Sequence, residues 1–460
     1  MSRPGTASAH PTAAPDGLPV PRRYWAIAAI VLSICMSVLD STITNVALPT
    51  IARDFQATPA ASIWVVNAYQ LAILAALLPL SALGEVVGYR RVSQAGLLVF
   101  TLASLACAFA PSLLALSIAR GVQGLGAAGI VSVNAALVRF TYPQRQLGRA
   151  IGINAFVVAT SAALGPTIAS LVLAVAHWRW LFGINVPLGL ITIAIARAAL
   201  PEAERHPRPL NPGGAALYAG TFVLLLSGLQ SLAHHSATWI ALLQIAAGAA
   251  LGVVLVRHEL PRHAPLIPFD LLRVRLFTLS LVASICAFIA QMCALVALPF
   301  EIQRLGHSAV ETGLYMTPWP LALAVAAPLA GRLADRYAAG LLGGLGLLVM
   351  AAGLLLLSLP GSGDAPGFIW RMAVCGAGFG LFQSPNSHAI LSSAPRPRSG
   401  AAGGMLSTSR LVGQTLGAAG VAILFRADPA GGSNEALRVA AALALLAAVV
   451  SAVRLRRKKE

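Results

Sequence analysis

The chain has 460 residues, of which 57% are hydrophobic and only 10% are charged, and its mean hydropathy is +0.78. A soluble domain carries about 25% charged residues, so this composition excludes an ordinary soluble enzyme as well as a disordered chain. The formal net charge is +17, but the basic residues recur between apolar segments and form no single patch, which argues against nucleic-acid binding. An integral membrane protein that crosses the bilayer many times is the expectation that remains.

A transmembrane helix needs about 20 apolar residues, and fourteen segments of the chain meet that requirement. They follow residues 1–24, which are rich in Pro, Ala, Gly and Ser and are expected to form a flexible cytoplasmic tail and no cleaved signal. In chain order, the spans are expected near residues 25–49, 60–83, 92–110, 113–138, 148–175, 178–200, 214–232, 239–256, 276–300, 311–331, 340–359, 368–391, 401–425 and 435–453.

The loops between these spans differ in charge. Arg and Lys gather on alternate loops, within residues 22–23, 90–91, 139–149, 205–208, 257–275, 332–336, 396–398 and 454–459. Cytoplasmic loops carry the excess of Lys and Arg, so both termini are predicted to lie in the cytoplasm. This alternation requires an even number of spans, which favours fourteen over thirteen.

A short pattern occurs twice, in residues 81–92 (SALGEVVGYRRV) after the second span and in residues 331–337 (GRLADRY) after the tenth. Repeats of this kind are typical of secondary transporters, whose substrate sites lie between the repeats near the middle of the membrane. We therefore expect an N-terminal six-helix bundle (25–200), a linker with an inserted transmembrane hairpin (201–275), a C-terminal six-helix bundle (276–453) and a basic cytoplasmic tail (454–460).

Among the fifteen acidic residues, Asp40 is predicted to be the one that lies well inside a span. A carboxylate in a membrane is costly and is functional by default, so Asp40 is our candidate for proton coupling, although a structural role in helix packing stays open. Arg120 in the fourth span is predicted to lie at a similar depth and is the expected partner. Arg410 in the thirteenth span is open to two interpretations, a structural hydrogen bond to carbonyl groups or a contact with substrate.

Further polar and aromatic side chains within the spans could line an adaptable substrate cavity. These candidates are Asn45, Asn67, Tyr69, Gln70, Asn134, Asn154, Gln291, Met292, Tyr315, Trp319, Gln383 and Asn386.

No metal site and no cofactor is expected. The five cysteines show no C-x-x-C spacing, and the G-x-G-x-x-G pattern at residues 124–129 lies in the middle of a span, where small residues let helices approach closely.

Four segments resemble the major facilitator superfamily, and specifically its branch of drug:proton antiporters with fourteen spans. They are residues 39–49 (LDSTITNVALP), residues 120–127 (RGVQGLGA), Gly165-Pro166, and residues 178–189 (WRWLFGINVPLG). The resemblance implies a fold of two six-helix bundles, proton coupling that involves Arg120, and a kink at Gly165 and Pro166 in the fifth span.

The same resemblance implies a cytoplasmic gate at the repeated loops, formed by Glu85, Gly88, Arg90, Arg91, Asp335 and Arg336. The first copy departs from the family pattern, since Ser81, Glu85 and Val86 stand where the family has Gly, Asp and Arg.

These inferences predict a proton-coupled exporter of drug-like or amphipathic small molecules in the cytoplasmic membrane, active as a monomer and powered by the proton gradient without a cofactor. One alternative is an exporter dedicated to a single endogenous metabolite, or an importer. A membrane-embedded enzyme is disfavoured because the chain has no cluster of paired acidic residues. A receptor without transport is the remaining alternative.

Overall fold

The computed structural model describes residues 17–143, 146–202, 211–232, 238–262, 267–334, 336–359, 365–394, 399–428 and 431–454. Within these ranges the secondary structure consists of helices, with no β-strand. In chain order they are α1 (Arg22–Asp54), α2 (Pro59–Ser62), α3 (Trp64–Val87), α4 (Tyr89–Ala108), α5 (Leu113–Thr141), α6 (Leu147–Val175), α7 (Trp180–Gly183), α8 (Asn185–Ala199), α9 (Pro212–Ser231), α10 (Thr238–Glu259), α11 (Phe269–Leu272), α12 (Arg275–Arg304), α13 (Ala309–Met316), α14 (Pro318–Ala334), α15 (Ala339–Leu357), α16 (Ala365–Ser392), α17 (Ser399–Ala427) and α18 (Gly432–Val453).

Each apolar segment that we expected to span the membrane is helical. Eleven helical segments of the described chain are long and apolar enough to cross a bilayer. Three of these segments contain a local break, between α2 and α3, between α7 and α8, and between α13 and α14. The short helix α11, which precedes α12, is an element that the hydropathy pattern did not predict.

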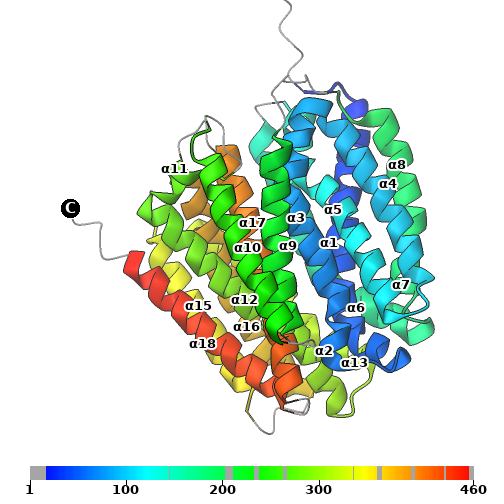
Figure 1. The fold of residues 1–460 in the computed structure, drawn as a ribbon, viewed down its shortest axis with the longest axis vertical. Helices are drawn as coiled ribbons and strands as arrows, with labels where there is room; N and C mark the ends of the chain where they lie inside the picture. The colour runs from blue at the N-terminus through cyan, green and yellow to red at the C-terminus, as the bar shows by residue number, and fades with distance from the viewer. Residues whose placement is uncertain are drawn as a thin grey trace, which may run out of the picture.

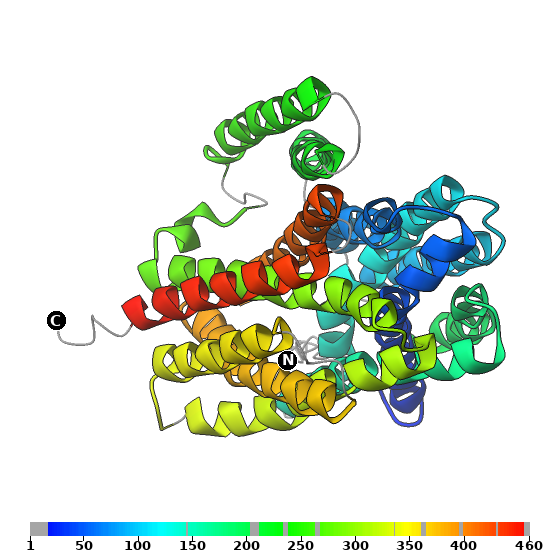
Figure 2. The same cartoon turned by 90° about the horizontal axis from the view of Figure 1, so that it is seen from below.

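The helices form two bundles, α1 to α8 and α12 to α18, with α9 and α10 beside them (Figure 1). Helix α9 packs against α10 and also touches α3 of the first bundle and α17 of the second. Figure 2 shows the same pair outside both bundles, next to the seam between α3 and α17. We call the face at which α1 and α12 begin and α18 ends the terminal face, and the opposite one the distal face.

The hydrophobic core shows how the bundles meet. One cluster joins both bundles and includes Leu48 and Trp178 of the first and Leu298 and Phe425 of the second, all near the distal face. Towards the terminal face, the core divides into a cluster in the first bundle and a separate smaller one in the second. The bundles are therefore packed tightly together at the distal face.

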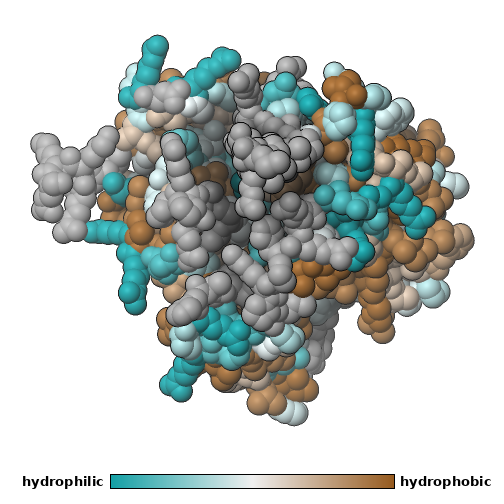
Figure 3. Space-filling model, turned by 90° about the horizontal axis from the view of Figure 1, so that it is seen from above, coloured by the Kyte–Doolittle hydropathy of each residue, from teal (hydrophilic) through white to brown (hydrophobic). Residues whose placement is uncertain are grey.

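Polar contacts cross between the bundles at the same end. Arg53 at the end of α1 donates to Gln303 at the end of α12 at 2.8 Å, and the hydroxyls of Thr167 and Thr317 lie 2.8 Å apart. On the terminal face, hydrophilic side chains are prominent, with apolar ones towards the rim (Figure 3). A polar face bordered by apolar flanks is the pattern expected of a protein held in a bilayer.

Candidate functional site

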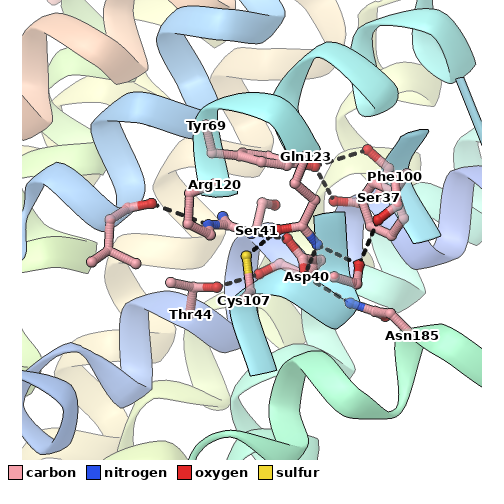
Figure 4. Close-up of polar contacts among 12 residues, drawn as sticks. Ser37, Asp40, Ser41, Thr44, Tyr69, Phe100, Cys107, Arg120, Gln123 and Asn185 are labelled. Atoms are coloured by element: carbon pink, nitrogen blue, oxygen red, sulfur yellow. Dashed lines mark hydrogen bonds and ion pairs between the residues drawn. The ribbon is translucent and has the colours of Figure 1, made fainter. Parts of the chain in front are cut away.

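Asp40 lies in the middle of α1, inside the first bundle, with 2% of its surface exposed. Its Oδ2 atom forms an ion pair with Arg120 of α5, the contact that their similar depths predicted. Its Oδ1 atom accepts hydrogen bonds from Gln123 Nε2 at 2.9 Å and from Asn185 Nδ2 at 2.8 Å. This one carboxylate therefore connects α1, α5 and α8 (Figure 4).

Arg120 is completely buried, and protein groups surround its guanidinium on several sides. Its Nε donates to the carbonyl oxygen of Val65 at 3.1 Å, and its Nη1 donates to Gln123 Oε1 at 2.6 Å. The rings of Tyr69 and Phe182 lie 4.1 and 5.5 Å from the guanidinium carbon. Hydrogen-bonding oxygens and aromatic rings thus supplement the charge of Asp40 in compensating a buried cation.

Gln123 links the two charged groups, because its amide oxygen faces Arg120 while its amide nitrogen faces Asp40. The nitrogen also donates to Ser104 Oγ of α4 at 2.8 Å. Sequence reasoning had found Gln123 and Asn185 only as parts of family motifs and had assigned neither to the site. For Gln123 the available signal was its position one helical turn after Arg120. For Asn185 it was its position inside the motif at residues 178–189.

Glycines bring the helices of this site close together. A side chain on Gly124 would place its Cβ atom 2.4 Å from the carbonyl oxygen of Tyr69 in α3, and one on Gly126 would place it 2.4 Å from the amide nitrogen of Phe100 in α4. Both distances are far below contact distance, so the missing side chains are what allow α5 to lie against α3 and α4. The glycine pattern at 124–129 therefore has a packing role next to Arg120.

Gly165 and Pro166 lie inside the continuous helix α6. A Cβ atom on Gly165 would meet Thr42 of α1 at 1.9 Å, and one on Gly313 of α13 would meet the Pro166 carbonyl oxygen at 2.5 Å. This part of α6 is therefore a close junction of both bundles. A kink that takes part in movement stays a prediction.

The first copy of the expected gate connects helix ends at the terminal face. Gly88 has φ of +107° between α3 and α4, a backbone conformation that favours glycine. Arg90 forms an ion pair with Glu202 at 3.0 Å and also donates to the Arg197 carbonyl at the end of α8. Glu85 lies in the last turn of α3, and Arg91 is exposed.

The second copy of the gate is only partly described by the structure. Arg336 is exposed after the end of α14. Asp335 lies outside the described residues.

The candidate cavity residues separate into different environments. Tyr69 belongs to the Asp40 site, where it stacks on Arg120 and bonds to Ser37. Met292, Tyr315 and Trp319 are packed in the cluster that joins the two bundles. Hydropathy does not reveal the rotation of an apolar helix, and in this conformation these four side chains pack against protein, so their place in a substrate cavity stays a prediction.

Several of the amide side chains in the cavity set act as connectors. Asn386 donates to the Ser280 carbonyl at 3.2 Å and accepts from Arg454 at 2.7 Å, which ties α16 to α12 and to the end of α18. Asn134 donates to Asn154 at 3.1 Å between α5 and α6. The remaining candidates, which stay predicted cavity residues, are Asn45, Asn67, Gln70 and Gln291, all buried, and Gln383, half-buried.

Comparison with known proteins places this architecture in a family. The model of the Major Facilitator Superfamily matches residues 30–418. The chain is 53% identical to YebQ of Escherichia coli (strain K12), an uncharacterized transporter, over 96% of this chain and 97% of that relative. It is 29% identical to the riboflavin transporter RibZ of Clostridioides difficile (strain 630), with 86% and 87% of the two chains covered.

The multidrug resistance protein Stp of Mycobacterium tuberculosis (strain CDC 1551 / Oshkosh) is 31% identical, over 84% of this chain and 73% of that protein. In fold, the chain is similar to a POT family transporter in complex with a thioalcohol-conjugated peptide, with a TM-score of 0.73, 12% sequence identity and coverage of 94% and 96%. The family match, the helical fold and these relatives agree, and the chain therefore belongs to the Major Facilitator Superfamily as an integral membrane transporter and not an enzyme.

Proposed function

We propose that the protein is a proton-coupled exporter of the fourteen-span branch of its superfamily. Helices α6, α16 and α17 have 29, 28 and 29 residues, each long enough to cross a bilayer at 1.5 Å per residue. Together with the eleven apolar segments they bring the number of spans to fourteen. In this arrangement α9 and α10 are an inserted hairpin between two six-span halves.

The observation that carries the proposal is the buried carboxylate of Asp40 and its three side-chain donors. Binding a proton would neutralise Asp40 and remove its attraction for the guanidinium of Arg120. The buried cation would then lack its counter-charge, a change that costs several kcal/mol when one partner of such a pair is removed. Proton binding at this site can therefore shift the packing of α1, α5 and α8 against one another.

Alternating access follows if this shift biases two arrangements of the bundles. The bundles share their core at the distal face and have separate cores towards the terminal face. With both termini in the cytoplasm, this is an inward-facing arrangement of a protein in the cytoplasmic membrane. Each proton that enters supplies about 2.3 kcal/mol per 100 mV of membrane potential in addition to the pH difference, so no cofactor is needed.

For the substrate we propose drug-like or amphipathic small molecules, carried by a single chain acting as a monomer. The multidrug resistance protein Stp, a relative at 31% identity, supports this class. A transporter dedicated to one metabolite is the second candidate, because RibZ is named for one compound.

The proposal is tested with the full-length protein in liposomes that contain a trapped pH dye. Ethidium, riboflavin and pyrenebutyrate are offered in turn while proton flux and substrate flux are recorded. We expect at least one compound to move against its own gradient when a pH difference is imposed. Asp40→Asn should abolish this uphill movement.

Asp54→Asn is the matched control, since it makes the same change at the distal end of the same helix, where Asp54 accepts from Trp178 Nε1. It should keep uphill transport. Asp40→Asn combined with Arg120→Gln removes both charges and guards against a folding defect of the single variant. Uphill transport that persists in Asp40→Asn at the wild-type rate would contradict the proposal.

A further inference from the structure

Arg410 is a second arginine inside a membrane helix, about 16 Å along α17 from its first residue at 1.5 Å per residue. The ring of Phe288 in α12 lies 5.7 Å from its guanidinium carbon. Across the described residues, no carboxylate forms an ion pair with Arg410 and no carbonyl or side-chain oxygen accepts a hydrogen bond from it. The structural interpretation of Arg410, a hydrogen bond to helix or loop carbonyls, therefore has no support.

Two other polar residues share the helical face of Arg410. Ser407 and Gln414 lie three positions before it and four positions after it, a spacing that places all three along one side of a helix. All three are half-buried, and neither Ser407 nor Gln414 has a hydrogen-bond partner in the described part of the chain. We call Ser407, Arg410 and Gln414 the polar stripe.

The neighbours of α17 show which way the polar stripe faces. On one side of the stripe, Ser409 bonds to Ser284 and Gly413 lies against Ile285, both in α12 of the same bundle. On the other side, Gly404 lies against Leu78 of α3 in the first bundle.

The remaining arc of α17, opposite the polar stripe, is apolar and carries Met405, Val412 and Leu416. Polar groups without partners do not face lipid, because each would cost several kcal/mol there. The polar stripe therefore lies towards the region between the two bundles.

We propose that the polar stripe is the part of the substrate site that binds an anionic group, and that the transported compounds are amphipathic organic anions such as aromatic carboxylates. Arg410 supplies a planar set of donors that matches a carboxylate, while Ser407 and Gln414 can donate on either side. The substrate anion takes the place of the counter-charge that Arg410 lacks. The apolar walls of the bundles accommodate the body of the molecule.

This inference deepens the proposed function and rests on it for the direction of transport. A proton that moves inward brings positive charge into the cell, and an organic anion that moves outward removes negative charge from it. Both movements therefore make the inside of the cell more positive. A negative-inside membrane potential would then favour both the inward movement of the proton and the outward movement of the anion. The substrate's charge thus determines how strongly the potential accelerates export.

The test uses three probes with one aromatic body and different head groups: pyrenebutyrate, pyrenebutanol and pyrenebutylamine. Equilibrium binding to the full-length protein in lipid nanodiscs is followed by fluorescence anisotropy without any gradient. A hydrogen bond to a charged group is worth about 1.5–3 kcal/mol, so pyrenebutyrate should bind at least about tenfold more tightly than pyrenebutanol. Pyrenebutylamine should bind most weakly.

Arg410→Gln should remove the preference for pyrenebutyrate over pyrenebutanol, and Arg410→Lys should keep part of it. Arg438→Gln is the matched control, because Arg438 is a surface residue paired with Glu435 at 2.9 Å, and it should bind as the wild type does. Equal or tighter binding of pyrenebutylamine by the wild type, no binding of any probe, or an unchanged preference in Arg410→Gln would each overturn the inference.

The binding assay distinguishes this inference from the proposed function. Asp40→Asn should lose uphill transport and still prefer pyrenebutyrate. A preference for the anion without any proton-driven transport would therefore support the polar stripe and contradict proton coupling. Proton-driven transport without that preference would support proton coupling and contradict the role given to the polar stripe.

Discussion

Two arginines inside the membrane differ in what surrounds them. Arg120 is fully buried, pairs with Asp40 and has two further oxygens and two aromatic rings around it. Arg410 is half-buried, lies beside one ring and has no acceptor among the described residues. A cation with a built-in counter-charge can hold helices together and respond to a proton, whereas a cation without one is available to an anion from outside.

The largest expected difference between the two arginines is in stability. Arg120→Gln leaves the carboxylate of Asp40 buried without its counter-charge and should lower the free energy of unfolding by about 3–5 kcal/mol. Arg410→Gln breaks no hydrogen bond and should change it by less than about 1 kcal/mol. Denaturant unfolding in mild detergent, followed by the fluorescence of the tryptophans, compares them directly.

The double variant Asp40→Asn with Arg120→Gln is the control for this comparison, since it removes both charges together. It should be more stable than the sum of the two single effects predicts. Equal losses of unfolding free energy in Arg120→Gln and Arg410→Gln would contradict the difference described between the two arginines.

A smaller effect is expected when Arg410 is given an acidic neighbour. Gln414→Glu places a carboxylate one helical turn away, where opposite charges attract. Anion preference in the binding assay should fall by roughly twofold or more, because the new carboxylate competes with the substrate for the guanidinium.

The matched control for this variant is Gln56→Glu, which introduces the same charge at an exposed position after the end of α1. It should leave the preference unchanged. A stronger anion preference in Gln414→Glu would contradict the role given to Arg410.

The sequence predicted the helical architecture well, because a long apolar run has few alternatives in a membrane. It also predicted the contact between Asp40 and Arg120, since depth along a helix follows from residue number. It did not predict which way each helix is turned. For that reason Tyr69 was expected in the cavity and is found against Arg120, and Gln123 was not recognised as the link between the two charges.

The direction in which the polar stripe faces could not be predicted from the sequence either. Ser407, Arg410 and Gln414 have the spacing of one helical face, which the sequence displays. Whether that face meets another helix, lipid or the region between the bundles depends on the packing of α3, α9 and α12 around α17. Only the contacts of Ser409, Gly413 and Gly404 decide it.

Direct detection of protons is the measurement that tests the central claim most sharply. Purified protein in a weakly buffered detergent solution is mixed with pyrenebutyrate at constant temperature, and the pH change is recorded. If Asp40 is the proton site of an antiporter, the wild type and Asp54→Asn should release protons as the substrate binds, while Asp40→Asn should release none. Proton release of the same size from Asp40→Asn would contradict the account.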